Sequence, residues 1–119
     1  MAPERLAPAC ARPWGQYRVL AEPSGSQIKE ILVRPGQRLS LQRHRYRGEH
    51  WYVVHGRAVA VCDDHEVTLE EGRSLEVPRG VWHRIMNPGD SGLLFIEVQT
   101  GEYFGEDDIE RLADDYGRI

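Results

Sequence analysis

Apolar and polar residues alternate over short runs along most of this chain, and turn residues separate the runs. Alternation with a period of two is typical of β-strands with one buried face, and Pro, Gly, Asn and Asp favour turns. The pattern predicts strands at residues 15–20, 27–34, 39–44, 50–55, 58–62, 66–69, 73–77, 82–86 and 93–99. Many short strands separated by turns predict an all-β sandwich or small barrel.

Only the tail of the chain has a helical pattern. An i, i+3, i+4, i+7 stripe, which is typical of an amphipathic helix, is formed by Ile109, Leu112, Ala113 and Tyr116. Acidic residues at 106–108 precede the stripe, where a helix favours negative charge, and Gly117 is a suitable stop. The sequence therefore predicts a short C-terminal helix after the strands.

Length and composition narrow the class of protein. A chain of 119 residues is expected to form a single domain over residues 1–119. The net charge of −4 argues against nucleic acid as a partner, and no apolar run reaches the roughly 20 residues that span a membrane. The N-terminus lacks the apolar core of a secretion signal. Cys10 and Cys62 have no paired-motif spacing, so we expect free thiols and a cytoplasmic location.

Four possible metal ligands lie within predicted strands or the turns beside them. Gln42 and His44 are two residues apart, so they share one face of a strand. Glu49 stands on the next run, and His83 arrives from a later strand. A lone histidine on an apolar strand is more often packed than metal-bound, but nitrogen and oxygen ligands together suit a divalent metal such as zinc, manganese or iron.

The spacing of glycines around these ligands resembles the two consensus motifs of the cupin superfamily. The second motif is matched without a gap by Gly72, Pro78, Gly80, His83 and Asn87. The resemblance implies a double-sheet jelly roll that holds one divalent metal through Gln42, His44, Glu49 and His83. Gln42 stands where the first motif usually has a histidine. Zinc is the expected metal, with manganese, iron, nickel and cobalt as alternatives.

Longer segments, at 12–17, 39–44, 49–51 and 96–118, resemble the C-terminal domain of type II phosphomannose isomerases. The resemblance covers residues 12–118. It implies interconversion of mannose 6-phosphate and fructose 6-phosphate, a step towards GDP-mannose. The pyrophosphorylase domain that usually precedes this domain is not found in the sequence, so guanylyltransferase activity is not implied. Arg45 and Tyr46 also depart from the family, which commonly has two histidines there.

The resemblance suggests roles for further residues. A cupin interior is polar near the metal, so we expect Lys29, Glu97 and Gln99 to face the substrate, although strand bulges can reverse such an assignment. Arg118 matches the closing Tyr-Gly-Arg of the family and is expected to stabilise charge or bind phosphate. The predicted catalytic residues are therefore Arg118, Lys29 and Glu97. His50 is an alternative proton carrier, but strand parity places it opposite Glu49.

Three arginines, at 43, 45 and 47, surround His44. Guanidinium groups bind phosphate in pairs of hydrogen bonds, so this patch is a candidate phosphate clamp at the rim of a cavity. A solvated turn is the alternative interpretation. Arg43, Arg45 and Gln99 are the predicted substrate-binding residues, and residues 105–118 are predicted to form a lid that delivers Arg118.

The sequence is also compatible with two other classes of protein. One is a metal-containing cupin that binds a sugar or sugar phosphate without turnover. The other is a non-haem iron oxygenase, which Gln42 disfavours because such sites use two histidines and one carboxylate. The expected partner is a small sugar phosphate, with neither nucleic acid nor membrane. An exposed edge strand would favour a homodimer.

Overall fold

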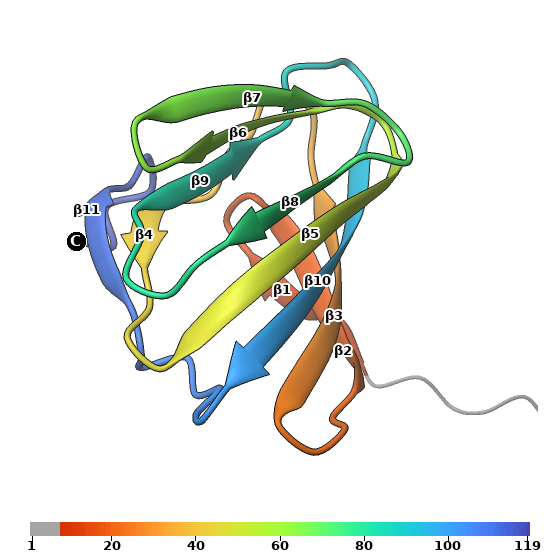
Figure 1. Cartoon of the computed structure of the whole chain (residues 1–119). Helices are drawn as coiled ribbons and strands as arrows, with labels where there is room; N and C mark the ends of the chain where they lie inside the picture. The colour runs from red at the N-terminus through yellow and green to blue at the C-terminus, as the bar shows by residue number, and fades with distance from the viewer. Residues whose placement is uncertain (1–7) are drawn as a thin grey trace, which may run out of the picture.

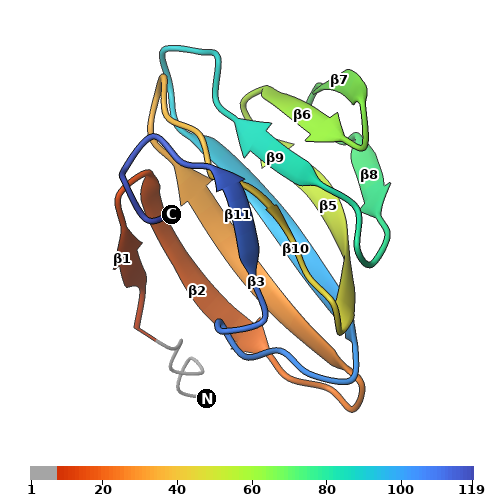
Figure 2. The same cartoon turned by 90° about the vertical axis from the view of Figure 1, so that its left-hand side faces the viewer.

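Two antiparallel β-sheets pack face to face in the computed structural model, which describes residues 8–119 (Figures 1 and 2). The strand order in the six-stranded sheet is β1 (Cys10–Arg12), β2 (Gly15–Ala21), β3 (Ser26–Val33), β10 (Leu93–Gly101), β5 (Arg47–His55) and β8 (Ser74–Val77). The order in the five-stranded sheet is β11 (Glu110–Ala113), β4 (Leu41–Arg43), β9 (His83–Met86), β6 (Ala58–Cys62) and β7 (His65–Leu69). The predicted all-β double-sheet fold is confirmed.

Side chains between the sheets are apolar at one end and polar at the other. At the apolar end, Val33 of β3 pairs with Leu93 of β10. Four residues earlier in β3, the buried Lys29 pairs with the buried Glu97. Trp51 of β5 lies at the boundary, opposite Glu97. The apolar part of the core consists of Trp14, Ile31, Val33, Trp51, Val53, Ala58, Ala60, Leu69, Val77, Ile85, Leu93 and Phe95. Buried polar groups need partners, so the polar end is where a ligand would be accommodated.

The predicted C-terminal helix is wrong: the tail forms the strand β11, which pairs with β4. Its side chains alternate as in a strand, because Ile109 and Arg111 line the interior while Leu112 is 60% exposed. Backbone hydrogen bonds to the edge of β4 outweigh the local helical preference of the tail. No helix within residues 8–119 is long and apolar enough to cross a membrane.

The predicted strands all occur, with shifts of a few residues at their ends. The turn between β8 and β9 brings the two glycine-framed motifs together. Gly80 has a φ of +74°, which glycine adopts without strain, and its N–H donates to the carbonyl of His44 at 2.9 Å. This bond fixes the chain of the first motif beside the turn that leads into His83.

Candidate metal centre and adjoining cavity

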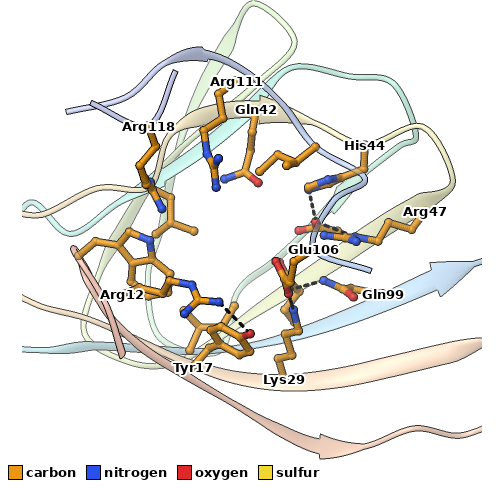
Figure 3. A pocket seen from close by; sticks show the side chains of 16 residues that line it. Arg12, Tyr17, Lys29, Gln42, His44, Arg47, Gln99, Glu106, Arg111 and Arg118 are labelled. Carbon is orange, nitrogen blue, oxygen red and sulfur yellow. Dashed lines mark hydrogen bonds and ion pairs between the residues drawn. The ribbon is translucent and has the colours of Figure 1, made fainter. Parts of the chain in front are cut away.

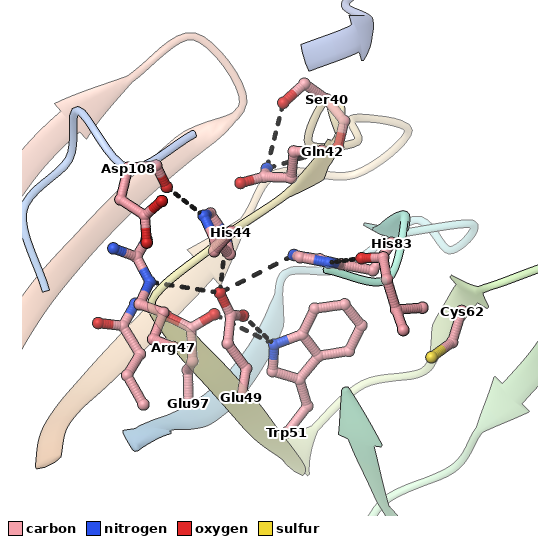
Figure 4. Close-up of polar contacts among 12 residues, drawn as sticks. Ser40, Gln42, His44, Arg47, Glu49, Trp51, Cys62, His83, Glu97 and Asp108 are labelled. Atoms are coloured by element: carbon pink, nitrogen blue, oxygen red, sulfur yellow. Dashed lines mark hydrogen bonds and ion pairs between the residues drawn. The ribbon is translucent and has the colours of Figure 1, made fainter. Parts of the chain in front are cut away.

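Three of the predicted ligands converge at the polar end of the sandwich (Figure 4). His44 follows β4, Glu49 lies on β5 and His83 begins β9. Glu49 Oε1 is 2.9 Å from His44 Nε2 and 3.8 Å from His83 Nε2. One possible ligand atom from each residue lies within 4.8 Å of the others, so this group could bind a metal ion.

Hydrogen bonds behind the two histidines orient their rings. His44 Nδ1 lies 2.6 Å from the carbonyl of Asp108, and His83 Nδ1 lies 2.9 Å from the carbonyl of Val81. A ring nitrogen that donates to a carbonyl leaves the other nitrogen, Nε2, free to bind a metal. Burial lowers the pKa of His83, which keeps the ring neutral, although the charge of Glu49 opposes this effect. Both rings therefore present the atoms that a divalent cation requires.

Gln42 is placed beside this group but is not turned fully towards it. It pairs in register with His83 and lines the cavity together with His44 and Glu49. Its Nε2 donates to the hydroxyl of Ser40 at 3.1 Å. The amide oxygen is the atom that could bind a metal, and its role as a fourth ligand stays a prediction.

A second carboxyl group, Glu97, lies next to Glu49. Trp51 Nε1 donates to Glu49 at 3.0 Å and to Glu97 at 3.1 Å, and Gln99 Nε2 donates to Glu97 at 2.9 Å. Burial raises the pKa of Glu97 well above its usual range, and the neighbouring charge of Glu49 raises it further. Burial opposes ionisation of Glu49 as well, but the hydrogen bond with Glu97 and the adjacent rings of His44 and His83 hold its pKa well below the usual range. These opposite shifts favour the neutral carboxyl at Glu97 and the carboxylate at Glu49.

A cavity with about 500 Å³ of space, counting its open mouth, adjoins this group (Figure 3). Its charged walls include five cationic side chains, Arg12, Lys29, Arg47, Arg111 and Arg118. Lys29 Nζ is 2.6 Å from Glu106 and lies 4.5 Å from the centre of the Tyr17 ring. Cationic side chains on several walls favour a negatively charged occupant.

The predicted site residues divide between this cavity and the outer surface. Lys29, Glu97, Gln99 and Arg118 line the cavity. Arg43 and Arg45 do not line it. Instead, Arg43 pairs with Glu110 at 3.0 Å and stacks on Trp82, and both Arg43 and Arg45 line a second pocket. His50 faces outward and lies 2.6 Å from Glu76.

The sequence pattern did not identify several residues of the cavity. Arg47 entered only as part of the rim patch, yet it shares a strand face with Glu49 and is 3% exposed. Strand parity could have placed it inside. Arg111 lies opposite Gln42 only because the tail is a strand, and Arg12 comes from the unpredicted strand β1. No local pattern identifies these two residues.

The tail supports the metal ligands in addition to lining the cavity. Asp108 accepts hydrogen bonds at 2.9 Å from the backbone N–H groups of Arg45 and Tyr46, and its carbonyl faces His44. Arg47 donates to the carbonyl of Gly105 at 3.0 Å. The position of His44 therefore depends on a segment more than sixty residues later in the chain.

Arg118 is held at the cavity by Asp114, which accepts its guanidinium at 2.7 and 2.9 Å. Gly117, with a φ of +75°, allows the turn between them. These hydrogen bonds lower the pKa of Asp114 to about 2. Because the pKa of Asp114 is lower in the folded protein than in the unfolded chain, the ion pair stabilises the fold fully at pH values above the unfolded pKa. This stabilisation is lost as the pH falls towards the folded pKa.

We therefore expect Asp114→Asn to lower the melting temperature at pH 7, and to lower it less at pH 3. Thermal unfolding of both proteins at the two pH values measures the effect. Asp90→Asn, at an exposed loop position, is the matched control and should show no such dependence. An equal loss at both pH values would contradict the assigned ion pair.

The two packed sheets, with two histidines and a glutamate converging at one end, define a cupin. A cupin-2 domain from Rhodospirillum rubrum has the same fold, with a TM-score of 0.68 and 21% identity over 78% of this chain and 67% of that chain. Residues 4–114 match the family described as Mannose-6-phosphate isomerase C-terminal. The chain belongs to this family, as its motifs indicated.

Relatives of this chain are larger proteins named for polysaccharide or sugar-nucleotide synthesis. The alginate biosynthesis protein AlgA of Pseudomonas aeruginosa is 52% identical over 107 residues, which is 90% of this chain and 22% of the relative. A mannose-1-phosphate guanylyltransferase of Escherichia coli is 44% identical over 108 residues, 91% of this chain and 23% of the relative. The chain thus spans under a quarter of either relative.

Proposed function

We propose that this chain is a metal-dependent aldose–ketose isomerase that interconverts mannose 6-phosphate and fructose 6-phosphate. The observation that carries the proposal is the buried His44–Glu49–His83 group beside the carboxyl of Glu97, in a cavity with cationic walls. The reaction needs polarised oxygens at C1 and C2, a group that moves a proton between these carbons, and a cation for the phosphate. The cavity offers a candidate for each.

Zinc is the metal that we propose, with manganese, iron, nickel or cobalt as alternatives. His44, Glu49 and His83 would hold it, and Gln42 would add an oxygen ligand. When bound, the cation would polarise the sugar oxygens and stabilise the negative charge that develops on them. Neutral imidazoles and one carboxylate are the donors that catalytic zinc sites use.

Glu97 is the residue that we propose moves the proton between C2 and C1. Its two oxygens are oriented by Trp51 and Gln99, so the carboxyl is fixed in the cavity wall. A carboxyl with a raised pKa can accept a proton and return it near neutral pH. Lys29, held by Glu106, would bind a sugar hydroxyl or the charge of the enediol.

The departures from the family pattern lie outside the cavity. Arg45 and Tyr46 replace the histidines that the family commonly has, but neither lines the cavity, and Tyr46 is 41% exposed. Replacements at these positions leave the described cavity walls unchanged. The catalytic groups that we propose are therefore independent of the missing histidines.

A sugar-phosphate-binding cupin without turnover is the second candidate. One relative carries this domain under the name mannose-1-phosphate guanylyltransferase, which does not mention isomerisation. The chain also matches less than a quarter of each relative. The same cavity would bind a sugar phosphate in either case, so activity has to be measured directly.

The test is a coupled assay that follows fructose 6-phosphate formation from mannose 6-phosphate by the zinc-loaded protein. We expect turnover that chelation abolishes and added zinc restores. Binding of the sugar phosphate without turnover, under each candidate metal, would favour the binding protein. Elemental analysis of the purified protein identifies the metal, and a metal other than iron would exclude an iron oxygenase.

A homodimer and a cytoplasmic location stay predictions. The edges of the two sheets are β1, β8, β11 and β7, and unpaired edges can pair with a second copy.

A further inference from the structure

Three arginines from the two ends of the described chain line the cavity. Arg12 comes from β1, Arg111 from β11 and Arg118 from the end of the chain. Figure 3 shows Arg12 and Arg118 across the cavity from His44, with Arg111 beside Gln42. The three guanidinium groups come from different parts of the chain and meet only in the folded protein.

These arginines have few carboxylate partners among residues 8–119. Arg12 donates only to neutral oxygens, the hydroxyl of Tyr17 at 3.1 Å and a backbone carbonyl. Arg118 is paired with Asp114, and Glu106, a carboxylate of the cavity wall, is already paired with Lys29. The arginine group therefore carries an excess of positive charge.

Arg111 supplies a second observation that points to an anion site. Its Nε is buried and has no hydrogen-bond partner among the described residues. An unpartnered buried donor is unfavourable, and a ligand that accepts from it would remove the penalty. Burial also lowers the pKa of Arg111, as does the neighbouring charge of Arg118. Both effects favour an anion beside this guanidinium group.

We infer that Arg12, Arg111 and Arg118 form the phosphate subsite of the cavity. The inference rests on the proposed function and deepens it, because the phosphate of a hexose 6-phosphate lies at the far end of the carbon chain from C1 and C2. C1 and C2 then face Glu97 and the histidines while guanidinium groups hold the phosphate oxygens. Arg43, committed to Glu110 and Trp82 at the rim, is the less suitable clamp.

Calorimetry with Arg111→Gln tests the inference, because this change removes no hydrogen bond seen in the structure. Fructose 6-phosphate, fructose and inorganic phosphate are titrated into zinc-loaded wild type and variant. Losing a charged hydrogen-bond donor should weaken the binding of fructose 6-phosphate and of inorganic phosphate about 10- to 100-fold. The binding of fructose should be unchanged. Arg57→Gln, at an exposed position far from the cavity, is the matched control. Melting temperatures check the fold.

Two further variants make the outcome decisive. Arg118→Gln should weaken the binding of fructose 6-phosphate and inorganic phosphate, as Arg111→Gln does. If Arg45→Gln weakens phosphate binding while Arg111→Gln does not, the clamp lies at the rim and the inference is overturned. Unchanged affinity in both cavity variants also overturns it, whether or not the wild type is an isomerase. If the cavity variants lose phosphate affinity but the wild type shows no turnover, the subsite is supported and the isomerase is rejected.

Discussion

His83→Ala is expected to abolish stoichiometric metal binding. The change removes one of the three buried ligand atoms that converge in the structure. Removing the hydrogen-bond partner of a metal-binding side chain weakens metal affinity by about 10- to 100-fold. Removing the metal-binding side chain itself should therefore weaken the affinity by more than about 100-fold. Metal content by elemental analysis, with affinity from competition against a chelator of known strength, measures the effect.

His50→Ala is the control for this variant. His50 lies on β5 near Glu49 but faces outward to Glu76, so its loss should leave metal content unchanged. Glu49→Gln is a second test if His83→Ala folds poorly, since the amide keeps the size of the carboxylate while losing its charge. A folded His83→Ala protein with full metal content and wild-type affinity would show that the three residues are not a metal centre.

Glu97→Gln is expected to lower kcat by about 100- to 10,000-fold, the usual contribution of a general acid–base group. Glutamine resembles the protonated carboxyl that the buried position favours, so the fold and the metal content should persist. The amide cannot accept and return a proton. The coupled isomerase assay measures kcat and KM, and we expect the loss mainly in kcat.

Solvent exchange separates a proton carrier from a structural role. Wild-type protein in D₂O should introduce deuterium at C1 or C2 of the sugar phosphate, as followed by NMR, and Glu97→Gln should not. Glu76→Gln, on the outer surface, is the matched control. Deuterium incorporation by Glu97→Gln at the wild-type rate would assign the proton transfer to another group.

Local pattern was sufficient for the strands β2 to β10, but not for β1 and β11. A period of two places Gln42 and His44 on one face whatever the rest of the fold does. Parity also places Glu97 and Gln99 on one face of their strand, and the resemblance to cupins, whose interior is polar near the metal, predicts that they and Lys29 face inward. Turn glycines such as Gly80 mark positions with positive φ, which few other residues adopt.

Pairing between distant segments decided what local pattern could not. Ile109, Leu112 and Tyr116 fit a helix by spacing, yet the open edge of β4 makes residues 110–113 a strand. That pairing carries Arg111 into the cavity and brings Asp108 to the ring of His44.

The amino-acid sequence by itself determined the all-β fold, the family and the residues that can bind a metal, because these depend on residue type and short spacing. Only the tertiary structure decided which charges share the cavity. Arg43 and Arg45 lie outside it, and Arg12, Arg47 and Arg111 lie inside. The reason is that sheet edges, and the segments that cover them, depend on contacts between residues far apart in the chain.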